Sequence, residues 1–250
     1  MCSQDPAKVD IPLGFIPYAT QPREIQLSSI STILNIDTRV ADLYSAPYDQ
    51  TAEQLDLAVE SLRERQESQI INNEDYGLLA NVADAQRVQP RTGAPTPDDL
   101  DELITKVWKE PAFFLAHPRA IAAFEREATR RGVPPVTVSR FGGTFITWRG
   151  IPLVPTDKLF VDGQKNPKAK TGKTNILLVR TGEAKRGVVG LYQEKLPGEL
   201  SRGVAVRPRG IDDDGVASFL LTIYCSAAIL ADDALAVLED VEVGEYYDYQ

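Results

Sequence analysis

The stretch from Thr96 to Asp157 constrains the fold more than any other part of the sequence. Thr96 stands where a helix N-cap is expected, and Pro97 follows at the first helical position, where proline sacrifices no hydrogen bond. Pro111 is expected to end this helix. Between these limits, apolar residues recur at the spacing of one buried helix face, namely Leu100, Leu103, Ile104, Val107 and Trp108. One side of the helix is therefore expected to pack against a core.

A short strand, a second helix and a hairpin complete this stretch. The continuous apolar run 112–116 is typical of a fully buried strand. The next helix is predicted to start at His117 and to end at Gly132. A turn between two strands is predicted at residues 149–150. No residues here form a set that could catalyse a reaction, so the stretch is interpreted as structural.

The flanking sequence supplies the remaining elements. Residues 1–22 carry four prolines and are expected to be irregular or extended. One or two strands are predicted within residues 23–36. Thr51, with Gln54 at capping-box spacing, is expected to begin a long amphipathic helix that ends at Asn72. The C-terminal half is expected to contain an exposed polar loop at 160–175, strands at 176–179, 188–192, 204–206 and 218–230, and a final strand or helix at 234–243.

Composition restricts the class of protein. The formal net charge of −9 argues against a dedicated nucleic-acid binder, because such affinity comes from Lys and Arg that neutralise phosphates. The only two cysteines, Cys2 and Cys225, argue against a disulfide framework. No signal peptide is expected, and no apolar run reaches the ~20 residues that a membrane helix needs. These features are typical of a cytoplasmic protein that binds neither nucleic acid nor membrane.

Two segments suggest ligand binding without meeting its requirements. Gly172-Lys173-Thr174 resembles the end of a phosphate-binding loop, but Pro167 replaces the glycine needed five positions earlier. A nucleotide-binding enzyme that uses the Lys165–Thr174 loop therefore remains only as an alternative of a different class. The acidic segment 212–215 lacks the glutamate that would complete a calcium loop, so a turn that leads into a strand is favoured.

The usual catalytic residue types are also interpreted as structural. The single histidine, His117, is expected to cap a helix, and Cys225 to be a small core residue. Paired carboxylates such as Asp98 and Asp101 are interpreted as solvated charges on a helix surface. The sequence therefore predicts a protein that is not an enzyme and has no catalytic, cofactor-binding or metal-binding residues.

Several short blocks, in a fixed order, carry a resemblance to a known family. They are TRVADLY (38–44), RERQES (63–68), GAPTPDDL (93–100), FITWRG (145–150) and LADDALAVL (230–238). Together they resemble the family 2 encapsulins, of the 2A type that packages a cysteine desulfurase. These shell proteins share the Hong Kong 97-type fold of the major capsid proteins of tailed phages.

The resemblance implies an α+β fold with an E-loop, a peripheral (P) domain and an axial (A) domain. Residues 1–22 would be the remnant of an N-terminal arm, and residues 23–48 the E-loop strand region. Residues 49–109 and 206–250 would form the P domain with its spine helix, and residues 110–205 the A domain. Family members carry a longer N-terminal region, so the first strand is expected to lack its usual partner, and a bare strand edge seeks another.

The resemblance also implies a function. Copies of the chain are expected to assemble with one another into an icosahedral nanocompartment, with T=1 symmetry, in the bacterial cytoplasm. The shell would enclose a cysteine desulfurase that carries pyridoxal phosphate and acts in sulfur metabolism or storage, while the shell protein itself holds no cofactor. A phage or prophage major capsid protein is the related alternative.

Pore residues are implied by position alone. The loop from Arg130 to Gly143 matches the region that approaches the five-fold pore in related shells. Arg130, Arg131 and Arg140 are therefore expected to line that pore, with ordinary surface arginines as the alternative interpretation.

Overall fold

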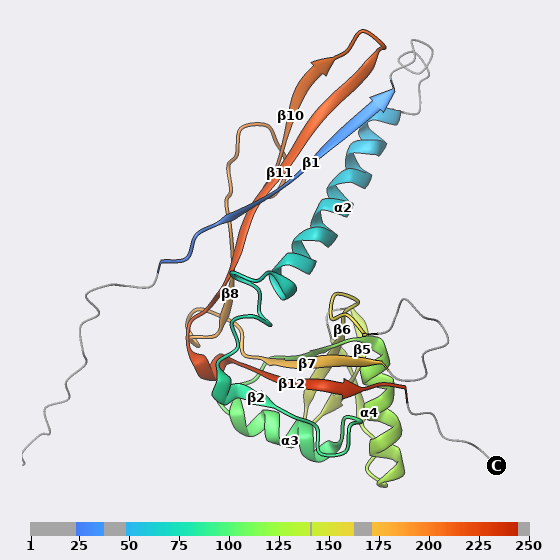
Figure 1. Cartoon of the computed structure of the whole chain (residues 1–250), viewed down its shortest axis with the longest axis vertical. Helices are drawn as coiled ribbons and strands as arrows, with labels where there is room; N and C mark the ends of the chain where they lie inside the picture. The colour runs from blue at the N-terminus through green and yellow to red at the C-terminus, as the bar shows by residue number, and fades with distance from the viewer. Residues whose placement is uncertain (1–23, 38–48, 141, 163–171, 245–250) are drawn as a thin grey trace, which may run out of the picture.

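The computed structural model describes residues 24–37, 49–140, 142–162 and 172–244. Within these residues, a long, narrow arm rises from a compact lobe (Figure 1). The arm holds a five-stranded sheet with one α-helix along it, and the lobe holds a seven-stranded sheet with two α-helices. The predicted α+β class is confirmed.

The arm is built around one long strand, β11 (Val216–Ile229). β1 (Ser28–Asp37) runs antiparallel along one side of β11, where the sequence predicts a strand. On the other side, β10 (Val204–Ile211) pairs with β11 near the tip and β8 (Val188–Tyr192) pairs with it near the lobe. β9 (Glu199–Ser201) extends the sheet beyond β10. β1 therefore has a partner on one side, and among the described residues its outer edge pairs with no strand.

One face of this sheet is covered by α2 (Gln50–Asn72). Asp49 caps the helix, because its Oδ1 accepts hydrogen bonds from the backbone N–H groups of Thr51 and Ala52 at 3.0 and 3.1 Å. The predicted capping box of Thr51 and Gln54 is therefore wrong by two residues. Leu62 is buried from α2 against the sheet, together with Val59 of the helix and Ile30, Leu221 and Ile223 of the strands.

The lobe sheet has the strand order β2-β12-β7-β3-β6-β5-β4. Its strands are β2 (Arg87–Val88), β3 (Phe113–Ala116), β4 (Val136–Arg140), β5 (Gly143–Trp148), β6 (Ile151–Pro155), β7 (Lys173–Val179) and β12 (Leu235–Glu242). Successive side chains of β7 alternate between the faces of the sheet. Ile176 and Leu178 join the core formed with the two helices of the lobe, whereas Leu177 and Val179 join a second core that includes Ile71 at the end of α2. The final element, predicted as a strand or a helix over 234–243, is the strand β12.

The two lobe helices, α3 (Pro97–Lys106) and α4 (Pro118–Arg130), begin where the sequence predicts. Thr96 caps α3, and the Nδ1 atom of His117 accepts from the backbone N–H of Arg119 at 3.1 Å to cap α4. However, α3 ends at Lys106, before Pro111, so the predicted burial of Trp108 is wrong. The Trp108 side chain is 66% exposed.

The segment after α4 differs from the predicted loop. β4 and β5 pair antiparallel from Val136 opposite Thr147 to Arg140 opposite Gly143, so residues 136–148 form a hairpin. β4 is the outermost strand of the lobe sheet. β5 then turns into β6 through Arg149 and Gly150, both with positive φ, as the predicted turn requires.

The predicted exposed loop over 160–175 is only partly correct. Val161 is buried, and residues 173–175 belong to β7. Residues 163–171, with three of the four lysines of that loop, lie outside the described residues. The segment expected to be the remnant of an N-terminal arm, residues 1–22, also lies outside them.

Arm and lobe meet where β7 leads toward β8 and β11 leads into β12. Arg180, at this joint, is 2% exposed and its Nη2 atom donates to Asp233 Oδ1 at 2.5 Å. The Nζ atom of Lys109 lies 3.1 Å from the other carboxylate oxygen of Asp233. The guanidinium of Arg180 is the main cause that lowers the pKa of Asp233 to about 2.

Candidate assembly surface

The start of α3 is fixed by a buried carboxylate. Asp99 is fully buried, and its Oδ2 atom accepts from the backbone N–H of Thr96 at 3.0 Å and from the Thr96 hydroxyl at 2.6 Å. Its Oδ1 atom accepts from Nη1 of Arg91 at 2.8 Å. Arg91 also binds Glu102 at 2.5 Å, and hydrogen bonds to Asp99 and Glu102 raise the pKa of its guanidinium. These contacts hold the loop before α3 against the helix.

Two further carboxylates of α3 bind arginines from later elements. Asp98 accepts from Nη1 of Arg131 at 2.9 Å, and Asp101 accepts from Nη2 of Arg149 at 2.9 Å. Asp101 also accepts from the indole Nε1 of Trp148 at 2.6 Å. Hydrogen bonding to Arg149 is the main cause that lowers the pKa of Asp101. The Asp98 side chain is 65% exposed, as expected of a solvated charge, but Asp98 and Asp101 also join α3 to α4 and to the β5–β6 turn.

The three arginines predicted at a pore are not gathered at one point of the chain's surface. Arg130 is the last residue of α4, with Nη1 3.7 Å from Oε1 of Glu127. Arg131 is the C-cap of α4 and forms the ion pair with Asp98. Arg140 ends β4 at the turn of the hairpin, opposite Gly143. They thus lie at the two ends of the segment that contains β4.

The hairpin that contains β4 presents apolar side chains to solvent. Val136 is 69% exposed, and Val133 and Val138 are also exposed. Val136 and Val138 lie on one face of β4, because alternate residues of a strand share a face. β4 pairs with β5 on one side, and among the described residues no strand pairs with its other edge. Exposed valines on a bare edge are typical of a surface that meets another chain.

A second candidate surface is the face of the arm sheet opposite α2. On β1 the residues directed away from the helix are Ser29, Ser31, Ile33 and Asn35, all exposed. Across the sheet, Ser31 and Thr222 share a hydrogen bond at 3.3 Å, and the Ser218 hydroxyl donates to Asn35 Oδ1 at 2.8 Å. Ile33 is 52% exposed on this face, and in the described part of the chain no helix covers it.

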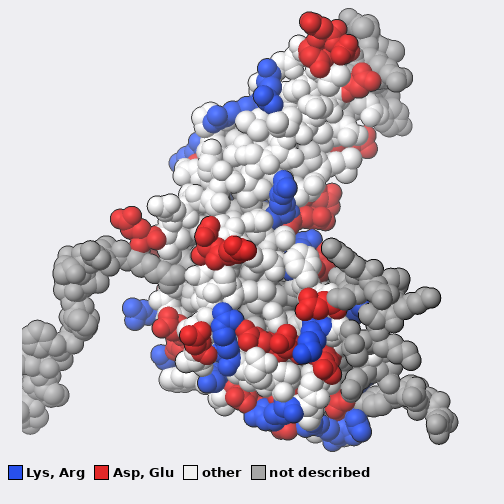
Figure 2. Space-filling view, viewed as in Figure 1, with Lys and Arg blue, Asp and Glu red and all other residues white. Residues whose placement is uncertain are grey.

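Charge is distributed unevenly between arm and lobe. On the face in Figure 2, acidic side chains gather at the tip of the arm, whereas both signs are mixed over the lobe. The tip carries Asp212, Asp213 and Asp214, all exposed in the turn between β10 and β11. Asp212 Oδ1 accepts from the backbone N–H groups of Asp214 and Val216 at 3.1 and 2.8 Å, so the predicted turn is confirmed.

The residues that suggested ligand binding or catalysis lie in strands or in the core. Lys173 and Thr174 lie in β7, whereas a phosphate-binding loop would continue into a helix at this point. A Cβ on Gly172 would come within 2.4 Å of the Val161 side chain, so this glycine permits close packing. Cys225 is buried, and burial raises the pKa of its thiol. Among the described residues, no group of three or more His, Cys, Asp or Glu could hold a metal ion, and no helix is long and apolar enough to cross a membrane.

The sequence analysis predicted neither the edge strand β4 nor the buried Arg180 at the joint. The pairs Pro134-Pro135 and Gly142-Gly143 bracket an alternating Val-Thr-Val-Ser segment, which could have indicated a short strand. Arg180 carries no such signal, because its partners Asp233 and Ala234 lie far away in sequence.

Comparisons with known proteins agree with this architecture. A family model described as SrpI-like, type 2A encapsulin shell protein, matches residues 1–245. The type 2A encapsulin shell protein SrpI of Synechococcus elongatus is 57% identical over 96% of this chain and 76% of its own length.

Solved structures show the same likeness. The structure of the holo-SrpI encapsulin complex from Synechococcus elongatus PCC 7942 matches with a TM-score of 0.87 and 58% identity, over 94% of this chain and 81% of that one. A capsid of a native GTA particle shares the fold at 11% identity, with a TM-score of 0.56 over 86% of this chain and 73% of that one.

These matches confirm the predicted Hong Kong 97-type fold and the expectation of a structural protein rather than an enzyme. Identity above 50% over nearly the whole chain extends the likeness from the fold to the family. The chain belongs to the SrpI-like family of type 2A encapsulin shell proteins.

Proposed function

We propose that copies of this chain close into an icosahedral shell with T=1 symmetry in the bacterial cytoplasm, and that the shell encloses a cysteine desulfurase. The observation that carries the proposal is the match to the holo-SrpI encapsulin complex over 94% of the chain. Each copy presents exposed apolar side chains on the β4 hairpin and on the arm, and contacts of this kind close by symmetry when repeated around an axis.

We propose a domain division that follows the two sheets. We assign the arm to the P domain and E-loop region, with α2 as the spine helix, and the lobe to the A domain. The ranges expected from sequence, 49–109 with 206–250 and 110–205, cross these sheets. They place α3 and β12 with the arm although both pack in the lobe, and they place β8 with the lobe although it pairs with β11.

We further propose that the segment from Arg130 to Arg140 reaches the five-fold pore. The position of β4 at the edge of the lobe sheet supports this. Arg131 forms an ion pair with Asp98, which holds its side chain against α3. A density map of the assembled particle tests the proposal. It fails if Arg130 and Arg140 both lie away from the five-fold axis.

The shell itself is tested by electron microscopy and mass photometry of the purified full chain. We expect uniform closed particles whose mass corresponds to 60 copies, the number that T=1 icosahedral symmetry requires. Only monomers or dimers would contradict the shell.

The cargo is tested by co-expression with a cysteine desulfurase. We expect the visible absorbance of pyridoxal phosphate to travel with the particle fraction. An unrelated pyridoxal-phosphate enzyme of similar size serves as the control and should stay outside. Equal enclosure of both enzymes, or of neither, would contradict the choice of cargo.

A further inference from the structure

A cavity of about 210 Å³ lies between helix α2 and the sheet of the arm. It forms where two strands meet end to end along the same side of β11. β8 ends at Tyr192, opposite Cys225, and β10 begins at Val204, opposite Ile223. Tyr192 and Ile223 both line the cavity. The space therefore arises from the gap between the two strand ends.

Two arginines line this cavity from different elements. Arg63 belongs to α2, and its Nη2 atom donates to the backbone carbonyl of Arg202 at 3.4 Å. Arg202 lies in the turn between β9 and β10, with the centre of its guanidinium 5.3 Å from the centroid of the Tyr192 ring. Gln66 follows Arg63 by three residues, on the same face of the helix, and adds a side-chain amide. Planar guanidinium groups match the paired oxygens of an oxyanion.

A carboxylate beside the cavity orients Arg202. Glu194 Oε1 accepts from Nε of Arg202 at 2.6 Å and from the Tyr192 hydroxyl at 3.0 Å. The hydrogen bond from Arg202 is the main cause that lowers the pKa of Glu194, so this carboxylate stays ionised. Two guanidinium groups and one carboxylate leave one positive charge in excess at the cavity.

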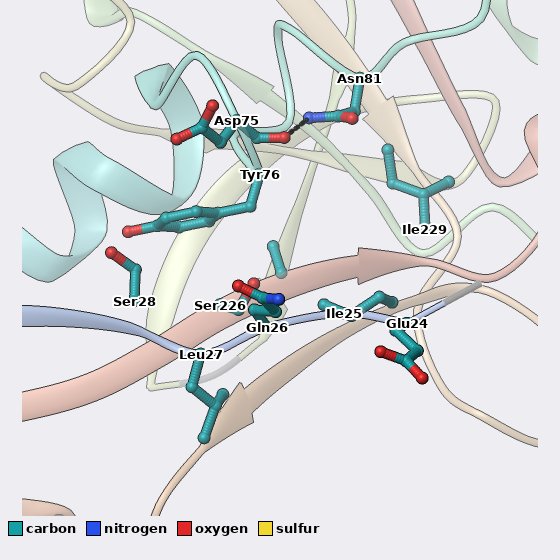
Figure 3. A pocket seen from close by; sticks show the side chains of 11 residues that line it. Glu24, Ile25, Gln26, Leu27, Ser28, Asp75, Tyr76, Asn81, Ser226 and Ile229 are labelled. Atoms are coloured by element: carbon teal, nitrogen blue, oxygen red, sulfur yellow. Dashed lines mark hydrogen bonds between the residues drawn. The ribbon is translucent and has the colours of Figure 1, made fainter.

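This wall differs in charge from the rest of the chain. Among the described residues no Asp or Glu lines the cavity, although the whole chain carries a net charge of −9. A larger cavity of about 400 Å³, shown in Figure 3, has the opposite character, because Glu24 and Asp75 line it and no described Lys or Arg does. Of these two cavities, only the smaller one suits an anion.

The size of the smaller cavity limits its ligand. Its volume is below the roughly 300 Å³ at which pockets for larger ligands begin, but it has room for a sulfate or phosphate ion with several waters. Gly203 lines it with a φ of 76° and contributes no side chain, which leaves the space beside the Tyr192 ring open. A Cβ on Gly203 would lie 3.4 Å from that ring.

We propose that this cavity binds a small oxyanion, of the sulfate or phosphate type, between Arg63 and Arg202. The oxygens of the ion accept hydrogen bonds from the two guanidinium groups and from the amide of Gln66. Because Arg63 belongs to α2 and Arg202 to the strands that α2 covers, the ion joins the helix to the sheet and stabilises the arm. The proposal does not depend on whether copies of the chain form a shell.

Calorimetric titration of the purified full chain with sodium sulfate tests the site. Sodium chloride at equal ionic strength is the control, because both solutions screen charges to the same extent. We expect saturable binding of one sulfate per chain and a rise in the unfolding temperature that chloride does not produce. No saturable binding at millimolar sulfate, or an equal effect of chloride, overturns the proposal.

Three substitutions of arginine locate the binding. Arg63→Gln and Arg202→Gln should each weaken sulfate binding at least about tenfold, the effect of one lost hydrogen bond between charged groups. Both side chains are exposed, so we expect the fold to persist, which circular dichroism checks. Arg65→Gln makes the same change on α2 outside the cavity and should leave the dissociation constant unchanged. Equal weakening in all three variants, or none in Arg63→Gln and Arg202→Gln, overturns the site.

A fourth variant should bind more tightly. Glu194→Gln keeps an oxygen that accepts from Arg202 but removes the negative charge beside the cavity. Sulfate binding should strengthen by about 2- to 5-fold, the usual strength of a charge interaction near the surface. General damage to the arm would weaken binding instead, so equal or weaker binding in this variant contradicts an anion at Arg202.

Titration of assembled particles identifies the source of the oxyanion. Sulfate that binds particles as tightly as the unassembled chain supports a free ion. Loss of binding in particles shows that an acidic side chain of a neighbouring copy fills the cavity, and overturns the assignment to a free ion. If the chain forms no particles, the proposed function fails, whereas titration of the unassembled chain still decides whether the cavity binds an oxyanion.

Discussion

A buried guanidinium needs a counter-charge wherever packing keeps water away. Arg180 meets this need through Asp233 alone: the Nη2 atom binds the carboxylate, while the Nε and Nη1 atoms are buried and unpaired among the described residues. The loss of Asp233 would leave a charge in the joint between arm and lobe. This ion pair therefore contributes to the stability of the joint.

We expect Asp233→Asn to lower the free energy of unfolding by about 3 kcal/mol at neutral pH, the cost of breaking a buried ion pair. The pKa of Asp233 is lowered from 3.8 to about 2, so its contribution is complete above pH 3.8 and is lost as the pH falls through 2. Urea unfolding of wild type and variant at pH 6 and pH 2 measures this, and the difference between them should shrink at the lower pH.

The control for this variant is Glu110→Gln, which breaks the exposed pair between Glu110 and Lys185. It should leave the free energy of unfolding nearly unchanged, because water screens exposed pairs. Equal losses in the two variants would contradict the role assigned to Arg180.

Truncation of the two tryptophans should change stability by very different amounts. Trp148 packs edge-on against Phe124 with ring centroids 5.5 Å apart and donates to Asp101, whereas Trp108 is exposed. Trp148→Ala should cost about 3–5 kcal/mol, and Trp108→Ala less than about 1 kcal/mol. Chemical denaturation of both variants checks this. A large loss for Trp108→Ala would mean that the side chain is buried in solution.

At the scale of elements, helix α3 carries its own start signal. Thr96→Ala removes both the cap and one partner of buried Asp99, so we expect a loss of about 1–2 kcal/mol. Thr96→Ser keeps the hydroxyl and should recover most of it. Thermal unfolding followed by circular dichroism compares the three proteins. A serine variant as unstable as the alanine variant would point to the lost methyl group rather than the cap.

A substitution in the β4 hairpin should affect assembly but not folding. Val136→Lys places a charge on an exposed position of an edge strand, so the free energy of unfolding should change by less than about 0.5 kcal/mol. Because charges on edges oppose pairing with other chains, the same variant should lower the yield of particles. Mass photometry measures the yield, with Thr137→Lys on the opposite face of β4 as the matched control. If Val136→Lys assembles as fully as the wild type, β4 is not part of the contact surface between copies.

Elements with local signals were predictable from sequence, and those set by distant contacts were not. Thr96-Pro97 and His117-Pro118 mark helix starts through chemistry within one turn, and the structure has both caps. Asp49 displaced the predicted cap at Thr51, because either residue could serve and only the geometry decides. Trp108 continues the apolar spacing of α3, but the helix stops before it can turn that side chain inward.

At the scale of the whole molecule, charge opposes assembly. Each copy carries a net charge of −9, so copies in a shell repel one another unless salt screens them. Raising the salt concentration from about 0.01 to 0.15 M shortens the screening length from about 30 to about 8 Å. We expect the fraction of chains in particles to rise over this range, as measured by light scattering. A fall would show that ion pairs between copies dominate the contacts.

The order of sequence blocks predicted the fold and the family, because many short matches in a fixed order are specific. The candidate surfaces could not be predicted in the same way. Beyond Cys225, for example, β11 is paired on the side of β8 as far as Ile229 but not on the side of β1, which begins at Ser28. β1 and β8 lie about 160 residues apart in sequence. The pattern of neither strand shows where the other one ends along β11.

β11 passes from the tip of the arm to the joint without interruption, and only the short turn Asp232–Ala234 separates it from β12 in the lobe. Fourteen residues at about 3.3 Å each make it about 46 Å long. The end of the strand near the lobe lies at the joint that holds Arg180. A tilt of about 5° there would move the tip by about 4 Å over such a length. Small adjustments at the joint would therefore set the curvature at which neighbouring copies meet.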